Sequence, residues 1–243
     1  MTTLESLKTQ INSVISLYSN GQMQEALDSV EALIKDYPNE SLLYNVGGAC
    51  YAGLGQLDAA VKSYERALDI NPDYAEAHNN LGVTLQGLSQ LDDAVRSLEK
   101  ALDIKPDYAE AHNNLGNAFK DLGQLDTAVK SYEQAIDIKP DFADAHYNLG
   151  SVLKEIGQLD TALKSYEQVL AIKPGYIEAF NNLGSVLEEL GQLDTAVKSY
   201  EKILAINPDF AEAHNNLGVT LEGLGQLDEA LKSYEQAIDI KPD

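Results

Sequence analysis

Between residues 75 and 108, packing side chains recur at helical spacing in two short runs. The first run consists of His78, Leu81, Gly82, Leu85 and Leu88. The second run consists of Ala94, Val95, Leu98, Ala101 and Ile104. This spacing predicts two helices of about three turns each. Helices of that length are marginally stable alone in water, so neighbouring helix pairs must cover the apolar face of each pair.

Polar and glycine-containing segments separate the predicted helices. Asp73, followed by Glu76 three residues later, has the pattern of a capping box and is expected to cap the first helix. Asp92 is expected to cap the second helix, and Pro106 to end it. Ser89 stands in the turn between the helices, where four later repeats have glycine, the residue that best tolerates the left-handed conformation ending a helix. These glycines are Gly123, Gly157, Gly191 and Gly225.

The prolines reveal a repeat of 34 residues. They are Pro38, Pro72, Pro106, Pro140, Pro174, Pro208 and Pro242. A fixed period of this size is the signature of a stacked repeat array. Taking proline as residue 32 of each repeat, we predict a single array over residues 1–243 with no linkers. After an N-terminal extension, residues 1–6, its repeats are 7–40, 41–74, 75–108, 109–142, 143–176, 177–210 and 211–243.

Small residues at fixed places predict close packing inside each helix pair. A glycine in the first helix allows the second helix to approach: Gly48, Gly82, Gly116, Gly150, Gly184 and Gly218. An alanine in the second helix has the same effect: Ala26, Ala60, Ala94, Ala128, Ala162, Ala196 and Ala230. Four residues later a tyrosine is expected to fill the remaining space, with Leu98 as the exception: Tyr64, Tyr132, Tyr166, Tyr200 and Tyr234.

The pattern His/aromatic-x-x-Leu-Gly-x-x-apolar, then Ala-x-x-x-Tyr, then Pro resembles the tetratricopeptide repeat (TPR) over residues 7–243. The family's usual tryptophan is replaced by His78, His112, His146, His214, Tyr44 and Phe180. The first repeat departs most, with Gln10, Ser13 and Val14 where an aromatic residue, Leu and Gly are expected, so we predict an N-terminal cap. The resemblance implies an all-α fold, a right-handed α-solenoid superhelix of seven repeats whose first helices line a concave groove.

Asparagine occupies the sixth place of six repeats, although it is a poor helix former. These residues are Asn12, Asn80, Asn114, Asn148, Asn182 and Asn216. One alternative is that each side chain hydrogen-bonds a neighbouring helix. The other is a ladder of amides that face a bound chain, because an amide both donates and accepts and can pair with a peptide backbone of any sequence. The AEAHNNLG segments resemble the superhelix of O-GlcNAc transferase-like proteins, which has such a ladder.

The peptide hypothesis adds variable residues at the ninth, twelfth and thirteenth places of the repeats, where specificity would arise. The candidate peptide-binding residues are Asn80, Asn114, Asn148, Asn182 and Asn216, with Asn117, Lys120, Lys154, Glu188 and Glu222. Each neutral hydrogen bond contributes about 0.5–1.5 kcal/mol, and association and peptide ordering cost a comparable total. The ladder alone would bind weakly, and the acidic surface favours a basic or polar protein or peptide.

Charge and composition exclude other partners. The 39 acidic and 17 basic residues give a net charge of −22, which repels phosphate backbones and argues against nucleic acid. No run of 18 apolar residues occurs, so we expect no membrane-spanning segment. The first twenty residues lack the apolar core of a secretory signal. Cys50 is the one cysteine, which fits a reducing compartment. We expect a cytoplasmic location.

The chain is not expected to be an enzyme or to bind a cofactor or metal. His78, His112 and His146 stand one repeat apart, roughly 10 Å, too far apart to ligate one zinc ion at about 2 Å. Asp69, Asn71 and Asp73 match only the opening of a calcium loop, since its glycine and glutamate places hold other residues. Cys50 lies among small packing residues, which favours a buried thiol over a nucleophile.

The sequence stops after Lys241 and Pro242, without a polar capping helix. The last helix, about Asp228–Ile240, should therefore expose Leu231, Tyr234 and Ile238. Two hypotheses follow: the chain is a fragment of a longer protein, or its uncapped C-terminal repeat self-associates end to end. We predict a non-enzymatic interaction scaffold that binds an extended peptide. The alternatives are the substrate-recognition arm of a larger glycosyltransferase-like protein and a self-assembling structural scaffold.

Overall fold

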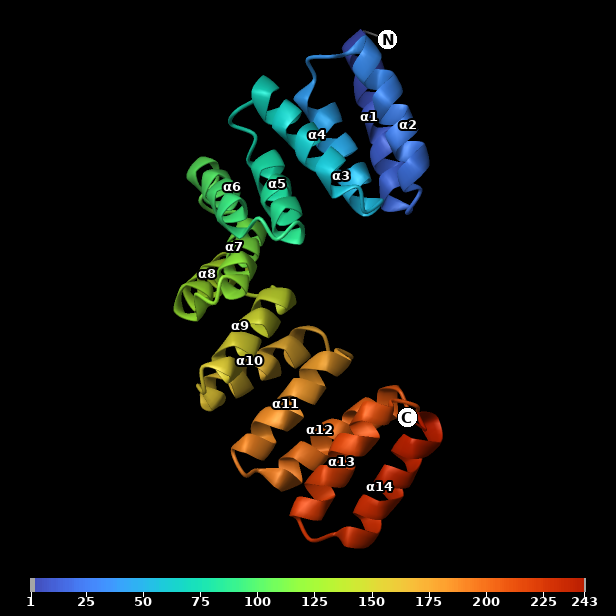
Figure 1. Ribbon diagram of the computed structural model, residues 1–243, viewed down its shortest axis with the longest axis vertical. Coiled ribbons are helices and arrows are strands. Elements are labelled where there is room, and N and C mark those ends of the chain that lie inside the picture. Colours follow the sequence, from blue (N-terminus) through green and yellow to red (C-terminus); the bar gives the residue numbers. More distant parts are fainter. Residues whose placement is uncertain (1–2, 243) are drawn as a thin grey trace. The chain divides into compact units, whose positions relative to one another are not determined.

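The computed structural model describes residues 3–242, with side chains from Leu7 onward. This part of the chain contains fourteen α-helices and no strand, arranged as seven helix–turn–helix pairs (Figure 1). The predicted all-α fold of seven repeats is therefore confirmed. From α3 to α13, the first helix of each pair begins at the residue predicted to open that repeat, whereas α1 begins within the predicted extension.

The chain divides into two compact units after Gln124. The first unit, Met1–Gln124, contains α1 (Thr3–Ser19), α2 (Met23–Asp36), α3 (Ser41–Gly53), α4 (Leu57–Ile70), α5 (Ala75–Gly87), α6 (Leu91–Ile104) and α7 (Ala109–Asp121). The second unit, Leu125–Asp243, contains α8 (Leu125–Ile138), α9 (Ala143–Glu155), α10 (Leu159–Ile172), α11 (Ile177–Glu189), α12 (Leu193–Ile206), α13 (Ala211–Gly223) and α14 (Leu227–Ile240). No helix in residues 3–242 is long and apolar enough to cross a membrane.

The predicted capping residues are wrong by one or two places. The N-cap of α5 is Tyr74, not Asp73, and no side chain caps the helix. The residue at this place is also the N-cap of α7, α9 and α13, where it is Tyr108, Phe142 and Phe210, so the aromatic residue before each first helix marks its start. The Tyr74 hydroxyl accepts a hydrogen bond from Asn45 Nδ2 at 3.2 Å. The N-cap of α6 is Gln90, and Asp92 lies inside the first turn. There its charge faces the positive end of the helix dipole instead of capping it.

The turn inside each pair requires a left-handed residue. Six glycines in this turn have positive φ angles between 72° and 79°: Gly21, Gly55, Gly123, Gly157, Gly191 and Gly225. Ser89 takes the same place with a φ of 60°. The turn geometry therefore holds in the third repeat even without glycine, at the strain that a side chain adds in this conformation.

The same packing contact recurs within the helix pairs, where a ring of the second helix lies over a glycine of the first. A Cβ atom added to Gly48 would lie 2.6 Å from the Tyr64 ring, and one added to Gly184 would lie 2.6 Å from the Tyr200 ring. In the third repeat, Leu98 takes this place over Gly82, again at 2.6 Å. The glycine thus admits the large side chain of the second helix, as the sequence predicts.

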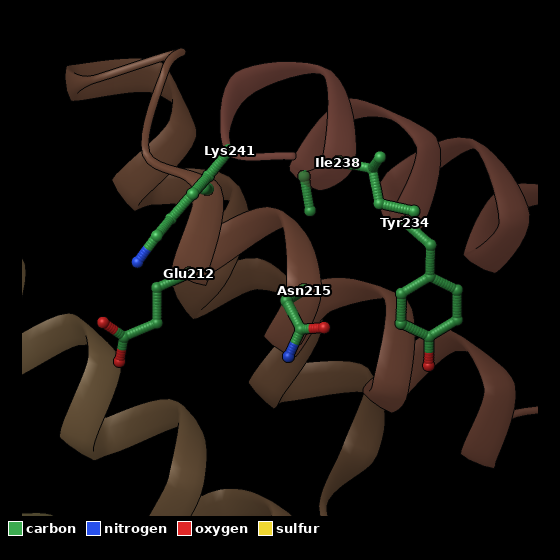
Figure 2. A pocket seen from close by; sticks show the side chains of 7 residues that line it. Glu212, Asn215, Tyr234, Ile238 and Lys241 are labelled. Atoms are coloured by element: carbon green, nitrogen blue, oxygen red, sulfur yellow. The ribbon is translucent and has the colours of Figure 1, made fainter. Parts of the chain in front are cut away.

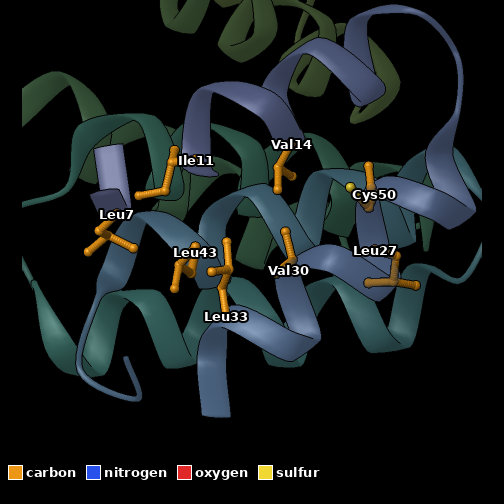
Figure 3. Close-up of a cluster of buried hydrophobic side chains, with 9 residues drawn as sticks. Leu7, Ile11, Val14, Leu27, Val30, Leu33, Leu43 and Cys50 are labelled. Carbon is orange, nitrogen blue, oxygen red and sulfur yellow. The ribbon is translucent and has the colours of Figure 1, made fainter. Parts of the chain in front are cut away.

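The apolar core of the first repeats is continuous from α1 to α3 (Figure 3). Its buried residues are Leu7, Ile11, Val14, Ala26, Leu27, Val30, Leu33, Leu43 and Cys50. Cys50 is fully buried, and burial raises the pKa of its thiol. The thiol stays protonated and inaccessible, which makes Cys50 a packing residue.

Candidate functional site

In the first unit, ladder asparagines connect the first helices of successive repeats. Asn80 of α5 donates from Nδ2 to Asn45 Oδ1 of α3 at 3.1 Å. Asn114 of α7 donates to Asn79 Oδ1 of α5 at 2.9 Å. The acceptors are buried fifth residues of the preceding repeats. The fifth and sixth places therefore act together, a pairing that the sequence analysis missed although Asn-Asn recurs at these places.

The second unit repeats the arrangement with one change. Asn216 of α13 donates to Asn181 Oδ1 of α11 at 2.9 Å. Asn182 of α11 donates instead to the Tyr147 hydroxyl of α9 at 3.0 Å, because tyrosine replaces asparagine at that fifth place. Asn148 lies half-buried on α9. Of the two roles predicted for the ladder, the hydrogen bond to a neighbouring helix is thus present at four residues: Asn80, Asn114, Asn182 and Asn216.

These bonds leave part of each amide unused. The side chains of Asn114, Asn182 and Asn216 are half-buried, so solvent reaches them. Within the described residues, their Oδ1 atoms accept no hydrogen bond, whereas Asn80 Oδ1 accepts one from Asn79 at 3.3 Å. Three ladder amides therefore combine a fixed orientation with an available acceptor.

The variable twelfth residues also make contacts between or within repeats. Lys154 Nζ donates to Ser185 Oγ at 2.6 Å and lies 3.4 Å from Glu189 Oε1. Glu188 accepts a hydrogen bond from Thr220, and Glu222 accepts one from the Tyr234 hydroxyl at 2.9 Å.

The remaining predicted site residues lie in the first unit. Asn117 and Lys120 are half-buried on α7. The structure therefore distributes the predicted site over two sets of first helices, α5 and α7 in the first unit and α9, α11 and α13 in the second.

An aromatic cluster in the second unit was not predicted. Tyr147 stacks on Tyr176 with ring centroids 5.2 Å apart and meets the Tyr166 ring edge-on at 5.9 Å. Burial raises the pKa of the Tyr166 phenol. Lys173 lies over the Tyr176 ring, and its Nζ donates to Asp144 at 2.8 Å, a bond that raises the pKa of the lysine. The sequence signal was the single replacement of asparagine by Tyr147.

The histidines hold the loops between repeats. His78 Nε2 lies 2.9 Å from the carbonyl oxygen of Pro72, and a carbonyl can only accept, so the ring nitrogen donates. The same bond recurs between His112 and Pro106, His146 and Pro140, and His214 and Pro208. Tyr44 donates its hydroxyl to Pro38 in the same way. These histidines and Tyr44, which stand where the family usually has tryptophan, therefore bond the loop before each first helix to that helix.

Comparisons with families identify the repeat. The family model described as TPR repeat matches residues 47–89, 87–123 and 116–157. The model described as Tetratricopeptide repeat matches residues 141–209 and 176–243. A search of the curated proteins finds no match.

Solved structures share this architecture. The crystal structure of MamA is 29% identical, with a TM-score of 0.64, over 67% of this chain and 95% of that one. YrrB, described as a TPR protein with an unusual peptide-binding site, is 27% identical, with a TM-score of 0.67, over 75% of this chain and 94% of that one. PilF of Pseudomonas aeruginosa is 20% identical, with a TM-score of 0.72, over 84% of this chain and 92% of that one, and shows likeness of fold alone.

Proposed function

The chain belongs to the tetratricopeptide-repeat family, and on that basis we propose that it is a non-enzymatic protein-interaction scaffold. Its ligand is an extended peptide segment of a protein partner. The peptide lies along the first helices, the side that the family resemblance assigns to a concave groove. YrrB, one of the similar structures, is described as having a peptide-binding site, which supports this class of function.

The observation that carries the proposal is the hydrogen bonding of the ladder amides, which uses one amide atom and leaves another available. Asn114, Asn182 and Asn216 are each oriented by one bond to the preceding helix and keep an available Oδ1. Such preorganised acceptors lose little entropy when a peptide N–H donates to them. Within the second unit, packed helices are about 8–10 Å apart and an extended peptide advances about 3.3 Å per residue, so Asn182 and Asn216 would meet peptide residues roughly three apart.

Basic or polar peptides are the preferred ligands. The net charge is −22, and the second place of successive first helices carries exposed carboxylates such as Glu178 and Glu212. Lys154 is partly neutralised by Glu189 and does not reverse this potential. A lysine- or arginine-containing peptide should associate faster and bind more tightly at low salt.

The test blocks the surface of the first helices around Val219 with a large side chain and leaves the ladder asparagines unchanged. Val219, the ninth residue of its repeat, is half exposed on α13 beside Asn216. Val219→Trp should fill this face and weaken binding at least tenfold. The matched control is Thr195→Trp on the exposed side of α12, which should keep the affinity within twofold. The probe is a synthetic 12-residue peptide selected from a displayed random library, and affinity is measured by fluorescence anisotropy.

Two results would contradict the proposal. One is the absence of any selected peptide that binds at micromolar concentration. The other is equal binding by the Val219→Trp and Thr195→Trp proteins, both with native circular dichroism. A peptide that binds the Val219→Trp protein with unchanged affinity must bind a surface other than the first helices.

The absence of catalysis is part of the proposal. Its support is structural, because His78, His112, His146 and His214 are bonded to loop carbonyls. A cytoplasmic location is proposed on the single buried cysteine, Cys50.

The role of a substrate-recognition arm for a larger glycosyltransferase-like protein would use the same first-helix face. A catalytic segment in the same polypeptide would distinguish it. The self-assembling scaffold requires end-to-end contacts between copies, for which a concentration-dependent mass in solution is the readout.

A further inference from the structure

In three repeats, a loop lysine lies over the aromatic residue that precedes the next first helix. The distances from Nζ to the ring centroid are 4.5 Å for Lys105 over Tyr108, 4.8 Å for Lys139 over Phe142 and 5.5 Å for Lys173 over Tyr176. All three are within the separation of about 6 Å at which the negative face of a ring attracts a cation. The contact is therefore a recurring feature of the loop between repeats.

The same lysines approach the carboxylate at the second place of their own repeat. Lys173 Nζ donates to Asp144 Oδ1 at 2.8 Å, and Lys105 Nζ lies 4.0 Å from Glu76 Oε1. In the last repeat, a lysine and a glutamate at these two places line a cavity of about 560 Å³, and Figure 2 shows Lys241 pointing toward Glu212. A ring and a carboxylate at these places thus form a lysine site, which the chain fills with its own side chain.

The sixth repeat, residues 177–210, keeps the carboxylate and the ring but lacks the lysine. Glu178 is exposed at the second place of α11, and Phe210 is half-buried directly before α13. The place of the lysine is taken by Asn207, whose Oδ1 accepts from the backbone N–H of Asp209 at 3.3 Å. Within residues 7–242, Glu178 has no hydrogen-bond or ion-pair partner. The site is therefore vacant in this repeat.

The missing lysine leaves Glu178 as an unbalanced charge beside an aromatic cluster. Burial raises the pKa of the Tyr176 phenol, and the carboxylates of Asp144 and Glu178 raise it further. Lys173 opposes this effect and pairs with Asp144. In the described part of the chain, no lysine does the same for Glu178. A carboxylate beside aromatic rings fits a cation, and the loop lysines of the other repeats show which cation fits here.

We propose that Glu178 and Phe210 bind a lysine side chain of the protein partner. Its ammonium lies over the Phe210 ring and pairs with the Glu178 carboxylate, as Lys173 does with Tyr176 and Asp144. The site lies inside the array, with one residue on α11 and the other directly before α13. This inference rests on the proposed peptide binding along the first helices, and it adds that the peptide carries a lysine where it passes α11.

Two variants remove the vacancy in different ways, and a third is their matched control. Asn207→Lys lets the chain fill the site itself, and Glu178→Gln removes the carboxylate. Asn71→Lys is the control, because Asn71 holds the same place in the second repeat and accepts from the Asp73 backbone N–H in the same way, but the second place there is Leu42. Each change raises the net charge by one unit, so a general effect of charge would be equal in all three.

The probe is the 12-residue peptide selected from a displayed random library, with each of its lysines replaced in turn by norleucine. Norleucine keeps the alkyl chain and loses the ammonium. For one lysine, fluorescence anisotropy should show binding to the wild type weakened about fivefold, the size expected of an exposed ion pair with a ring contact. The same replacement should cost less than about twofold in Asn207→Lys and in Glu178→Gln, and still about fivefold in Asn71→Lys.

Three results would overturn the proposal in variants with native circular dichroism. A selected peptide whose binding depends on none of its lysines removes the lysine site. Lysine dependence that persists in Asn207→Lys and Glu178→Gln assigns the lysine to another carboxylate. Loss of the dependence in Asn71→Lys as well assigns it to net charge. Failure of the proposed peptide binding looks different, because then no peptide is selected or Val219→Trp leaves its affinity unchanged.

Discussion

The pairs α11–α12 and α13–α14 have nearly the same packing residues but different burial. Tyr200 lies over Gly184 and is 1% exposed, whereas Tyr234 lies over Gly218 and is only half-buried. The local sequence and the glycine contact are equivalent, so the difference comes from α13, which covers the first pair. Burial in this array is therefore supplied largely by the next helix in the stack.

The largest contrast is expected from removing the two tyrosine rings. Tyr200→Ala should lower the free energy of unfolding by about 3–5 kcal/mol, the range for a fully buried aromatic side chain. Tyr234→Ala should lower it by only about 1–2 kcal/mol, because much of its ring is already in water. Urea denaturation followed by circular dichroism measures both. Equal losses would mean that α13 contributes little to the burial of Tyr200.

The glycines beneath these rings should respond differently to a methyl group. An added Cβ would lie 2.6 Å from the ring at Gly184 and 2.7 Å at Gly218. Gly184→Ala should cost about 1–3 kcal/mol, since the enclosed Tyr200 ring has no space to move. Gly218→Ala should be near neutral, because Tyr234 can shift toward solvent and alanine favours the helix by about 0.5–1 kcal/mol. A similar loss at both glycines would contradict this interpretation.

Alkaline pH should separate the same two tyrosines. Burial raises the pKa of Tyr200 strongly, and burial with the Glu222 hydrogen bond raises that of Tyr234. Above the usual tyrosine pKa of about 10, the unfolded chain releases the Tyr200 proton while the folded chain retains it. Stability should therefore be retained below pH 10 and fall above it, by about 1.4 kcal/mol per pH unit for each such tyrosine.

Ultraviolet titration at 295 nm checks this prediction. Tyr200→Phe is the matched variant, since it keeps the ring and removes the ionising group. It should reduce the alkaline loss of stability, whereas Tyr234→Phe should change it less. An alkaline transition identical in both variants and the wild type would show that Tyr200 ionisation does not drive it.

The smallest effect concerns the fifth-place asparagines. Asn181→Ala should lower stability by about 1 kcal/mol, because Asn216 Nδ2 loses its acceptor and Glu212 its donor. Asn215→Ala should stay within about 0.5 kcal/mol, since the exposed side chain has no described partner. Thermal melts at equal concentration compare the two. If Asn215→Ala destabilised the protein as much, the covering helix would not account for the difference.

Repeat spacing predicted the elements well and their exact ends less well. The Pro period recurs seven times, the first-helix glycine six times and the tyrosine five times. These places are local to each repeat, so they locate the helix pairs and their internal packing. The capping role assigned to Asp73 was wrong because α5 begins one residue later, after Tyr74, and no side chain caps it. The same start recurs after Phe142 and Phe210, so the capping-box pattern at Asp73 did not decide where the helix begins.

The candidate site was predictable only in part. The position of Asn114 or Asn182 on the first helix follows from spacing, but an isolated sequence cannot show which amide atoms are already bonded. The acceptors Asn79 and Tyr147 come from the preceding repeat, and nothing in the sequence of a single repeat requires that pairing. Peptide binding along these helices therefore stays a prediction.

The sequence by itself determined the all-α class, the helix pairs, the glycine turns and the acidic charge, because each depends on residues within one 34-residue period. Only the tertiary structure decided which ladder amides bond the preceding helix, that the histidines bond loop carbonyls, and how deeply each tyrosine ring is buried. These properties depend on the neighbour that each helix meets. Burial and hydrogen bonding are relations between repeats, and identical residues such as Tyr200 and Tyr234 differ as soon as one of them lacks that neighbour.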